Sequence, residues 1–238
     1  MNNYVDLHHH LIYGVDDGAQ SLEDMQKMIL RAAQEGVTEL VCTSHATPGV
    51  EPFPWEKYSA HLTQARDFIR EQGLTMQLYE GCEVLYTDAS SRLVSEGKYP
   101  TLAGSDLVLV EFSPDATFQR LCEAAKSFGM MGYSVLFAHV ERYDALRNMK
   151  NVRTLRDEYG VYMQMNASTI IHKQGFFTKR WMSKMFAEGH IDCIATDAHG
   201  LQTRRCRMNA CHQLLAEQYG EDFADELCGG FQRRMLEI

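Results

Sequence analysis

The chain has 238 residues, 45% of them hydrophobic, which fits a single domain over residues 1–238. Its formal net charge of −9 disfavours nucleic acid as a partner, because nucleic-acid binding needs a basic surface. No apolar run reaches the ~18 residues that span a bilayer, and the polar amino terminus lacks a signal-peptide core, so we expect no membrane insertion. The seven cysteines lie mostly in apolar segments, which predicts a reduced, cytoplasmic protein and not a disulfide framework.

Seven short apolar runs recur along the chain, and each ends at a residue that can hold a metal ion or orient a residue that does. They are rich in valine, leucine and isoleucine and do not alternate strictly, as expected of parallel strands buried on both faces. The runs and the polar residues after them are Tyr4 to Leu7 before His8 and His10, Leu40 to Ser44 before His45, Gln77 to Tyr79 before Glu80 and Glu83, Leu107 to Val110 before Glu111, Val135 to Ala138 before His139, Val161 to Met163 before Gln164 and Asn166, and Cys193 to Thr196 before Asp197 and His199.

Segments of helical character lie between these runs. The first has Ser21 as its N-cap, carries Leu22, Met25 and Ile29 on one face, and stops at Gly36. Further helices are expected at residues 56–71, 118–128, 144–159, 178–188 and 204–219. Alternating strands and helices predict about seven parallel βα units in a closed or nearly closed α/β barrel, with reactive residues at the carboxyl ends of the strands.

The residues after the runs are of the types that bind divalent metal ions. His8 and His10 are two positions apart, so they point to the same face of their strand. Taken singly, each histidine also fits a hydrogen-bonded core role and each glutamate a salt bridge. Together they exceed what one ion takes and imply two or three divalent ions bridged by carboxylates. The predicted ligands are His8, His10, His45, Glu83, Glu111, His139, Asp197 and His199. We expect Asp6 and Asn166 to orient histidines or a bound water.

The segment Asp6-Leu7-His8-His9-His10 resembles the D-x-H-x-H opening of the PHP (polymerase and histidinol phosphatase) superfamily. Further motifs resemble one branch of it, the bacterial tyrosine phosphatases of capsule and exopolysaccharide synthesis, and the resemblance covers nearly the whole chain in order. These motifs are Val15-Asp16-Asp17-Gly18, Thr43-Ser44-His45, Gly81-Cys82-Glu83, Glu111-Phe112-Ser113, Ala138-His139-Val140-Glu141-Arg142-Tyr143 and Ala195-Thr196-Asp197-Ala198-His199.

The resemblance implies a distorted seven-stranded (βα)7 TIM-like barrel and a site for three metal ions, usually manganese, with iron, zinc or magnesium as alternatives. It implies hydrolysis of phosphotyrosine on a tyrosine autokinase, the eight ligands named above, and Arg142 and Arg204 as the residues that bind the phosphate. Arg142 also fits a helix cap or a salt bridge, and Arg205 and Arg207 lie close enough to Arg204 to compete for its role.

Such a site predicts in-line attack on phosphorus by a metal-bridging hydroxide, without a covalent phosphoenzyme, because divalent ions lower the pKa of a bound water toward ~7. Two guanidinium groups would clamp the non-bridging oxygens of the phosphate in pairs.

The segment from Pro48 to Tyr58 carries several aromatic residues. These either wall a pocket for an aromatic ring or attach the loop to the barrel.

Cys228 and Arg234 match the C-x5-R pattern of thiol-based tyrosine phosphatases. They follow a helical stretch and lack the strand, loop and helix that cradle phosphate in that class, so we expect no role for them.

The alternative functions are a small-molecule phosphatase of the histidinol-phosphate type, a nuclease, which the acidic balance disfavours, and a catalytically silent metal-binding module. The sequence leaves the native metal, the protein substrate and the oligomeric state open.

Overall fold

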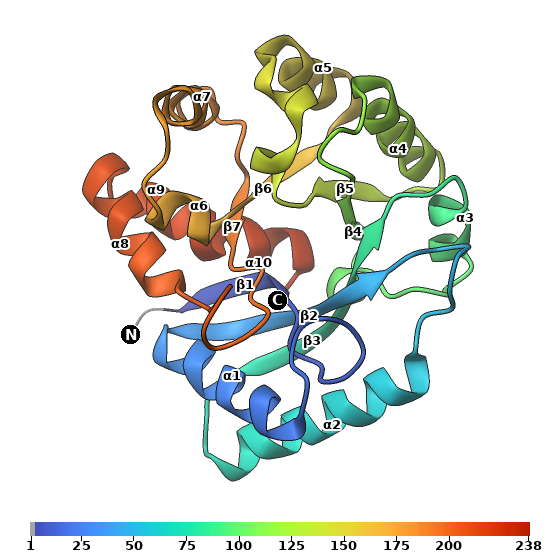
Figure 1. Cartoon of the computed structure of the whole chain (residues 1–238), viewed down its shortest axis with the longest axis vertical. Helices are drawn as coiled ribbons and strands as arrows, with labels where there is room; N and C mark the ends of the chain where they lie inside the picture. Colours follow the sequence, from blue (N-terminus) through green and yellow to red (C-terminus); the bar gives the residue numbers. More distant parts are fainter. Residues whose placement is uncertain (1–2) are drawn as a thin grey trace.

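The computed structural model describes residues 3–238 (Figure 1). Over these residues, seven strands form one sheet in the order β1 to β7, and all six neighbouring pairs are parallel. The strands are β1 (Tyr4–His9), β2 (Val37–Ala46), β3 (Gln77–Leu85), β4 (Leu107–Glu111), β5 (Ser134–Phe137), β6 (Tyr162–Asn166) and β7 (Cys193–Ala195). The predicted barrel of parallel βα units is therefore confirmed.

Helices surround the sheet and connect its strands (Figure 1). The α-helices are α1 (Leu22–Gln34), α2 (Trp55–Glu71), α3 (Ser90–Ser95), α4 (Phe118–Met130), α5 (Met149–Tyr159), α6 (Ala167–Ile171), α7 (Phe176–Ala187), α8 (Met208–Tyr219), α9 (Glu221–Asp225) and α10 (Phe231–Leu236). Three 3-10 turns, η1 (Leu102–Gly104), η2 (Val140–Arg142) and η3 (Asp144–Arg147), and one π-helical turn, η4 (Glu226–Gly230), complete this part of the chain. No helix in residues 3–238 is long and apolar enough to cross a membrane.

Local side-chain chemistry explains where several helices begin. Ser21 Oγ accepts from the backbone N–H of Asp24 at 3.1 Å and caps α1, as predicted. The helix expected at 144–159 is interrupted, because Asn148 leaves the helical conformation and caps α5 with its side chain. The helix expected from residue 204 begins only at Met208, and Arg204 itself has a left-handed φ of 47°.

The barrel closes at a seam between β1 and β7. One isolated parallel bridge crosses it at the carboxyl end, between His9 of β1 and Ala198, which follows the end of β7. Further toward the amino end, the buried Gln232 of α10 donates from Nε2 to the carbonyl of Ile194 at 3.2 Å and reaches that of Val5 at 3.5 Å. One side chain thus replaces part of a strand ladder.

The pairing of β2 with β3 sets two predicted ligands side by side, because His45 and Glu83 are register partners. Tyr58 of α2 fixes this pair of strands from the outside. Its fully buried hydroxyl lies 2.6 Å from the carbonyl of Cys42 on β2 and accepts from the N–H of Gly81 on β3 at 3.1 Å. The helix is therefore fastened to the strands that carry the site.

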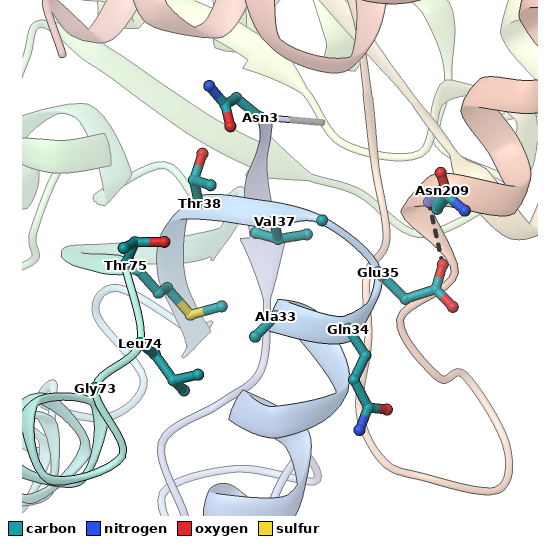
Figure 2. Close-up of a pocket in the computed structure, with 12 residues that line it drawn as sticks. Asn3, Ala33, Gln34, Glu35, Val37, Thr38, Gly73, Leu74, Thr75 and Asn209 are labelled. Atoms are coloured by element: carbon teal, nitrogen blue, oxygen red, sulfur yellow. Dashed lines mark hydrogen bonds between the residues drawn. The ribbon is translucent and has the colours of Figure 1, made fainter. Parts of the chain in front are cut away.

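The amino-terminal end of the barrel holds a cavity of about 530 Å³, lined by Asn3, Glu35, Thr38, Thr75 and Asn209 among others (Figure 2). The backbone N–H of Asn209 donates to the Glu35 carboxylate at 3.1 Å. The lining residues include one carboxylate and no histidine or cysteine. This cavity therefore offers few groups that could bind a metal ion.

Replacing Tyr58 by phenylalanine tests how strongly α2 is fastened. We expect Tyr58→Phe to lower the free energy of unfolding by about 1–3 kcal/mol, because the Gly81 N–H loses its acceptor inside the protein. Urea denaturation measures this change. Tyr79→Phe is the control, since it removes a hydroxyl that bonds Gln77 at the surface. Equal losses in the two variants would contradict the role given to Tyr58.

Candidate metal centre

The structure brings all eight predicted ligands together at the carboxyl end of the barrel. Contacts between their side chains link every one of them to the group. Glu83 lies at the centre. It is fully buried, and imidazoles from β1, β2 and the segment after β5 surround it. Glu80, in contrast, is absent from these contacts.

The innermost group consists of His8, His10, Glu83 and Asp197, all buried. His8 Nε2 lies 3.2 Å from His10 Nε2, 3.2 Å from Glu83 Oε2 and 3.4 Å from Asp197 Oδ1. His10 Nε2 lies 3.3 Å from Glu83 Oε2 and 3.6 Å from Asp197 Oδ1. Ligand atoms about 2.1 Å from a four-coordinate ion lie roughly 3.4 Å apart. These separations therefore match a single coordination shell.

A second group shares Glu83 with the first. His45 Nδ1 lies 3.1 Å from Glu83 Oε2 and 3.1 Å from Glu111 Oε1. His139 Nε2 lies 2.8 Å from Glu83 Oε1 and 3.6 Å from Glu111 Oε2. Each of the two carboxylates contacts more than one imidazole. This arrangement suits bridging between neighbouring ions.

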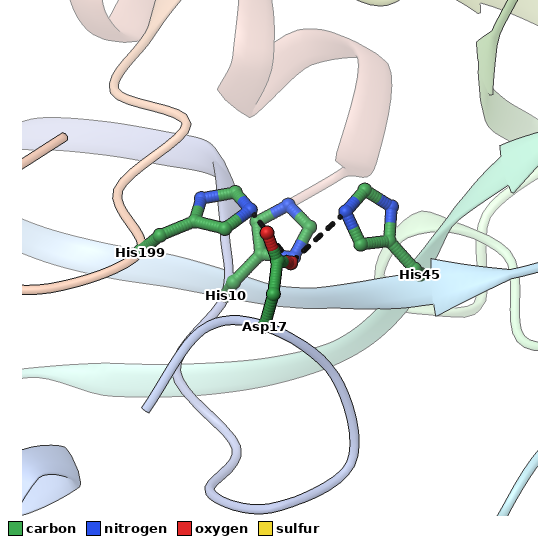
Figure 3. A group of neighbouring side chains, drawn as sticks. All are labelled: His10, Asp17, His45 and His199. Carbon is green, nitrogen blue, oxygen red and sulfur yellow. Dashed lines mark ion pairs between the residues drawn. The ribbon is translucent and has the colours of Figure 1, made fainter. Parts of the chain in front are cut away.

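A third group contains a residue to which we assigned no ligand role, Asp17. Its Oδ1 atom lies 3.2 Å from His45 Nε2 and 3.2 Å from His199 Nε2, between the two rings (Figure 3). His10 completes the group, with its ring centroid 3.7 Å from that of His199. The Asp17 side chain is 62% exposed, so this group forms the open side of the centre.

The loop after β1 carries Asp17, and the preceding residue, Asp16, contacts two of the predicted ligands. Asp16 Oδ2 accepts from the backbone N–H of His45 at 3.1 Å and lies 2.9 Å from His10 Nδ1. Gly18 lets the loop approach closely, because a Cβ there would lie 2.2 Å from the His10 carbonyl oxygen. The sequence signal for both carboxylates was the Asp-Asp-Gly motif in the loop.

Hydrogen bonds fix which nitrogen of three histidines faces the cluster. His8 Nδ1 lies 3.2 Å from Gln164 Oε1, and this oxygen also accepts from the His139 N–H. His10 Nδ1 faces the Asp16 carboxylate, and His199 Nδ1 faces the backbone carbonyl of Asp197. Each partner can only accept, so Nδ1 carries the proton and the Nε2 lone pair points inward.

Two buried atoms in the cluster make no hydrogen bond, Glu83 Oε2 and His199 Nε2. Three imidazole nitrogens nevertheless lie within 3.3 Å of Glu83 Oε2. Converging lone pairs and unsatisfied buried oxygens are costly without a cation among them. The residues therefore fit divalent metal ions.

The local electrostatics favour positive charge. Burial opposes ionisation of Glu83, but the imidazoles around it hold its pKa well below the usual range. Burial likewise opposes protonation of His45, but the neighbouring carboxylates of Glu111 and Glu83 raise its pKa to about 11. Burial and the neighbouring His10 lower the pKa of His199 to about 4, which keeps that ring neutral. A neutral imidazole is the form that binds metal.

The two residues expected to orient ligands differ in what they contact. Asn166 Nδ2 donates to Asp197 Oδ2 at 2.8 Å, and its Oδ1 accepts from Gln164, which holds His8. Asp6 instead accepts from the backbone N–H and the hydroxyl of Thr196. These hydrogen bonds go to Thr196 and not to a histidine ring, and they tie β1 to the residue before Asp197.

Both predicted arginines reach the cluster through Asp197. Arg142 Nη2 donates to Oδ2 and Arg204 Nη2 donates to Oδ1, each at 2.7 Å. About 40% of each side chain is exposed, so much of each guanidinium faces solvent. His139, Asp197 and Arg204 all have left-handed φ angles between 33° and 51°. Strain of this kind concentrates at functional sites.

The aromatic loop is attached to the barrel, and Phe53 and Trp55 also line an open cavity of about 630 Å³. Phe53 is buried, and its ring centroid lies 5.0 Å from that of Trp55 and 5.1 Å from that of Tyr58. Trp55 Nε1 donates to the Lys98 carbonyl at 2.8 Å. A cavity of about 150 Å³ remains between this loop and His45.

Cys228 does not have the environment of a thiol nucleophile. It is fully buried in the π-helical turn, and burial raises its pKa to about 12. Arg234 pairs with Glu226. The C-x5-R spacing therefore arises from helix packing and not from a phosphate-binding loop.

The chain is similar to known proteins over nearly its whole length. A family model for capsular polysaccharide synthesis, CpsB/CapC, matches residues 4–237. The chain is similar to the tyrosine-protein phosphatase CpsB of Streptococcus pneumoniae, with 31% identity over 98% of both chains. It is also similar to the tyrosine-protein phosphatase YwqE of Bacillus subtilis, with 21% identity over 92% of this chain and 86% of that protein.

Solved structures share the fold. One of them comes from work on the crystal structures of YwqE from Bacillus subtilis and CpsB from Streptococcus pneumoniae, described as unique metal-dependent tyrosine phosphatases. It superposes with a TM-score of 0.87 at 20% identity, over 98% of this chain and 94% of that chain. A histidinol phosphate phosphatase from Lactococcus lactis, in complex with zinc, L-histidinol and phosphate, gives a TM-score of 0.57 at 14% identity, over 96% and 97% of the two chains. With the family model matching nearly its whole length, the chain belongs to the CpsB/CapC family of capsular polysaccharide synthesis.

Proposed function

We propose that the chain is a metal-dependent protein-tyrosine phosphatase, built as one catalytic domain over residues 1–238. The observation that carries this proposal is the convergence of imidazole lone pairs and buried carboxylates on one cluster, with two arginines at its edge. The similarity to CpsB and YwqE supports phosphotyrosine as the substrate.

The eight predicted ligands, with Asp17, would hold two or three divalent ions, for which manganese is our choice among manganese, iron, zinc and magnesium. When bound, such ions supply positive charge for a phosphate dianion and activate water for attack on phosphorus. Glu83 and Glu111 would keep the ions adjacent, since each contacts imidazoles of more than one group.

Arg142 and Arg204 would bind the phosphate. Each uses one N–H group on Asp197, and a guanidinium has five N–H donors in a planar fork, so donors remain for phosphate oxygens. The two side chains approach opposite oxygens of Asp197 and would grip a phosphate next to the cluster from two sides. The phenolate of tyrosine has a pKa near 10, so it leaves with little help from a general acid.

The proposed partner is a phosphotyrosine-bearing protein, and membership in a capsule-synthesis family favours a tyrosine autokinase of that pathway. The open side of the centre suits a protein segment, because Asp17 and both arginines are partly exposed. The seven cysteines are all free thiols, which supports a reducing cytoplasmic location. A histidinol-phosphate phosphatase is the second candidate, because that enzyme from Lactococcus lactis shares the fold.

The central experiment compares three substrates on manganese-loaded and chelated protein. We expect turnover of a phosphotyrosine peptide to exceed that of a phosphoserine peptide and of histidinol phosphate by at least about tenfold in kcat/KM. Exhaustive chelation should abolish turnover, and manganese should restore it. Preferential turnover of histidinol phosphate would establish the second candidate. Elemental analysis finding less than one ion per loaded chain, together with no turnover, would identify a silent module.

The arginines are tested by conservative substitution. We expect Arg142→Lys and Arg204→Lys each to lower kcat/KM for a phosphotyrosine peptide by about 10- to 100-fold, because lysine keeps the charge and loses the two-pronged contact. Metal content should be unchanged. Arg70→Lys, which alters an exposed pair with Asp67 on α2, is the matched control. Turnover equal to that of the control would contradict the phosphate-binding role.

The buried thiol provides a test of mechanism. We expect Cys228→Ser to retain turnover of p-nitrophenyl phosphate within about twofold, since the thiol is buried and its pKa is raised. Asp197→Asn should lose most of its turnover. Complete inactivity of a folded Cys228→Ser variant, judged by circular dichroism, would overturn metal-based chemistry in favour of a cysteine nucleophile.

A further inference from the structure

We propose that a groove between the start of α5 and α7 binds acidic residues that flank the phosphotyrosine of the substrate. This basic groove is lined by Arg147, Met149, Phe177, Arg180, Trp181 and Lys184. The inference rests on the proposed phosphatase function and goes beyond it, because it assigns a sequence preference to the substrate and a surface that reads it.

Charge along the chain is strongly uneven. Residues 145–187 contain eight basic residues and only two acidic ones, Asp157 and Glu158, for a net charge of +6. The whole chain carries −9, so the remainder carries −15. The two acidic residues lie at the end of α5, away from the groove lining. A cationic surface on an acidic protein selects acidic partners by complementarity.

The groove is a concave feature with an aromatic floor. Its volume is about 410 Å³. Trp181 is buried, its Nε1 donates to the carbonyl of Leu146, and the Arg147 guanidinium lies 4.6 Å from the centre of its ring. Within residues 3–238, neither Arg180 nor Lys184 forms an ion pair, so both charges remain available to a ligand.

An exposed aromatic pair borders the groove. Phe176 and Phe177, at the start of α7, are 72% and 84% exposed and pack edge to face with ring centroids 5.6 Å apart. Phenylalanines this exposed at the edge of a cavity mark interaction surfaces. Together with the unpaired cations, they suit a peptide that offers carboxylates and an apolar or aromatic side chain.

The groove is connected to the phosphate site through a short run of backbone. Arg147 Nη2 donates to the carbonyl of Glu141 at 2.6 Å, and the next residue, Arg142, contacts Asp197 in the metal cluster. Both features therefore belong to the segment that follows β5. An extended peptide advances about 3.3 Å per residue, so a chain anchored by its phosphate would reach the groove within several residues.

Kinetics on two phosphotyrosine peptides, one with glutamates and one with glutamines beside the phosphotyrosine, test the proposal. We expect the wild type to prefer the acidic peptide through a lower KM, with the preference declining as salt is added. Arg180→Glu combined with Lys184→Glu should lower the ratio of kcat/KM for the acidic peptide to kcat/KM for p-nitrophenyl phosphate by about tenfold, because attraction becomes repulsion. Lys126→Glu on α4 is the matched control and should leave the ratio unchanged.

Binding provides a readout that does not depend on turnover. Fluorescence anisotropy with a labelled, unphosphorylated acidic peptide should show affinity for the wild type and its loss in the double variant and in Phe177→Ser. If no substrate is hydrolysed while this binding persists, the phosphatase proposal fails, and the groove remains a site for acidic peptides without a role in choosing a substrate. If hydrolysis proceeds but both peptides give equal KM values, the groove proposal fails alone. The groove proposal also fails if the double variant still binds the acidic peptide but no longer binds anionic lipid vesicles. The same holds if the double variant still binds the peptide but no longer self-associates in light scattering.

Discussion

Burial of the Glu83 carboxylate is the constraint on which the rest of this structure depends. An ionised carboxylate inside a barrel is costly unless positive charge surrounds it. Here β1 and the residue that follows it contribute His8 and His10, β2 contributes His45, and the segment after β5 contributes His139, all within 3.3 Å of a Glu83 oxygen. Parallel strands make this possible, because neighbours in register present side chains at one level of the barrel. The fold and the metal centre therefore form a single electrostatic unit, in which bound cations would complete what the imidazoles begin.

Outside the cluster, a layer of neutral groups sets the geometry. Gln164 holds the His8 ring and the backbone after β5 at the same time, and Asn166 holds both Gln164 and Asp197. The chain thus fixes ring orientation before any ligand arrives, which reduces the reorganisation that binding requires. The proposed phosphate-binding arginines and the innermost group also meet at Asp197, because both arginines donate to the carboxylate that belongs to that group.

Much of this was readable from the sequence, for physical reasons. The seven apolar runs predicted the strands, because burial on both faces requires continuous hydrophobic residues. The polar residues after these runs predicted a shared site at the carboxyl end of the barrel, because parallel strands end at the same edge. Asp17 was not predicted as a ligand, because it lies in a loop and a loop has no sequence periodicity that fixes where its side chains lie. The contact between Asp6 and Thr196 was not predicted, because the two residues are 190 positions apart in the chain. The break at Asn148 and the late start of α8 reflect local hydrogen bonding and a left-handed Arg204 that helix patterns do not encode. The short helices α3, α6 and α9 were too brief for any period to show.

The seam between β1 and β7 has a consequence for biosynthesis. Gln232 supplies hydrogen bonds that the two strands do not make to each other, and the innermost group draws His8 and His10 from one side of the seam and Asp197 from the other. A nascent chain can pair β1 through β6 in sequence as it emerges from the ribosome. The innermost group, however, is complete only when Asp197 has folded beside β1, because its side chains come from both ends of the chain.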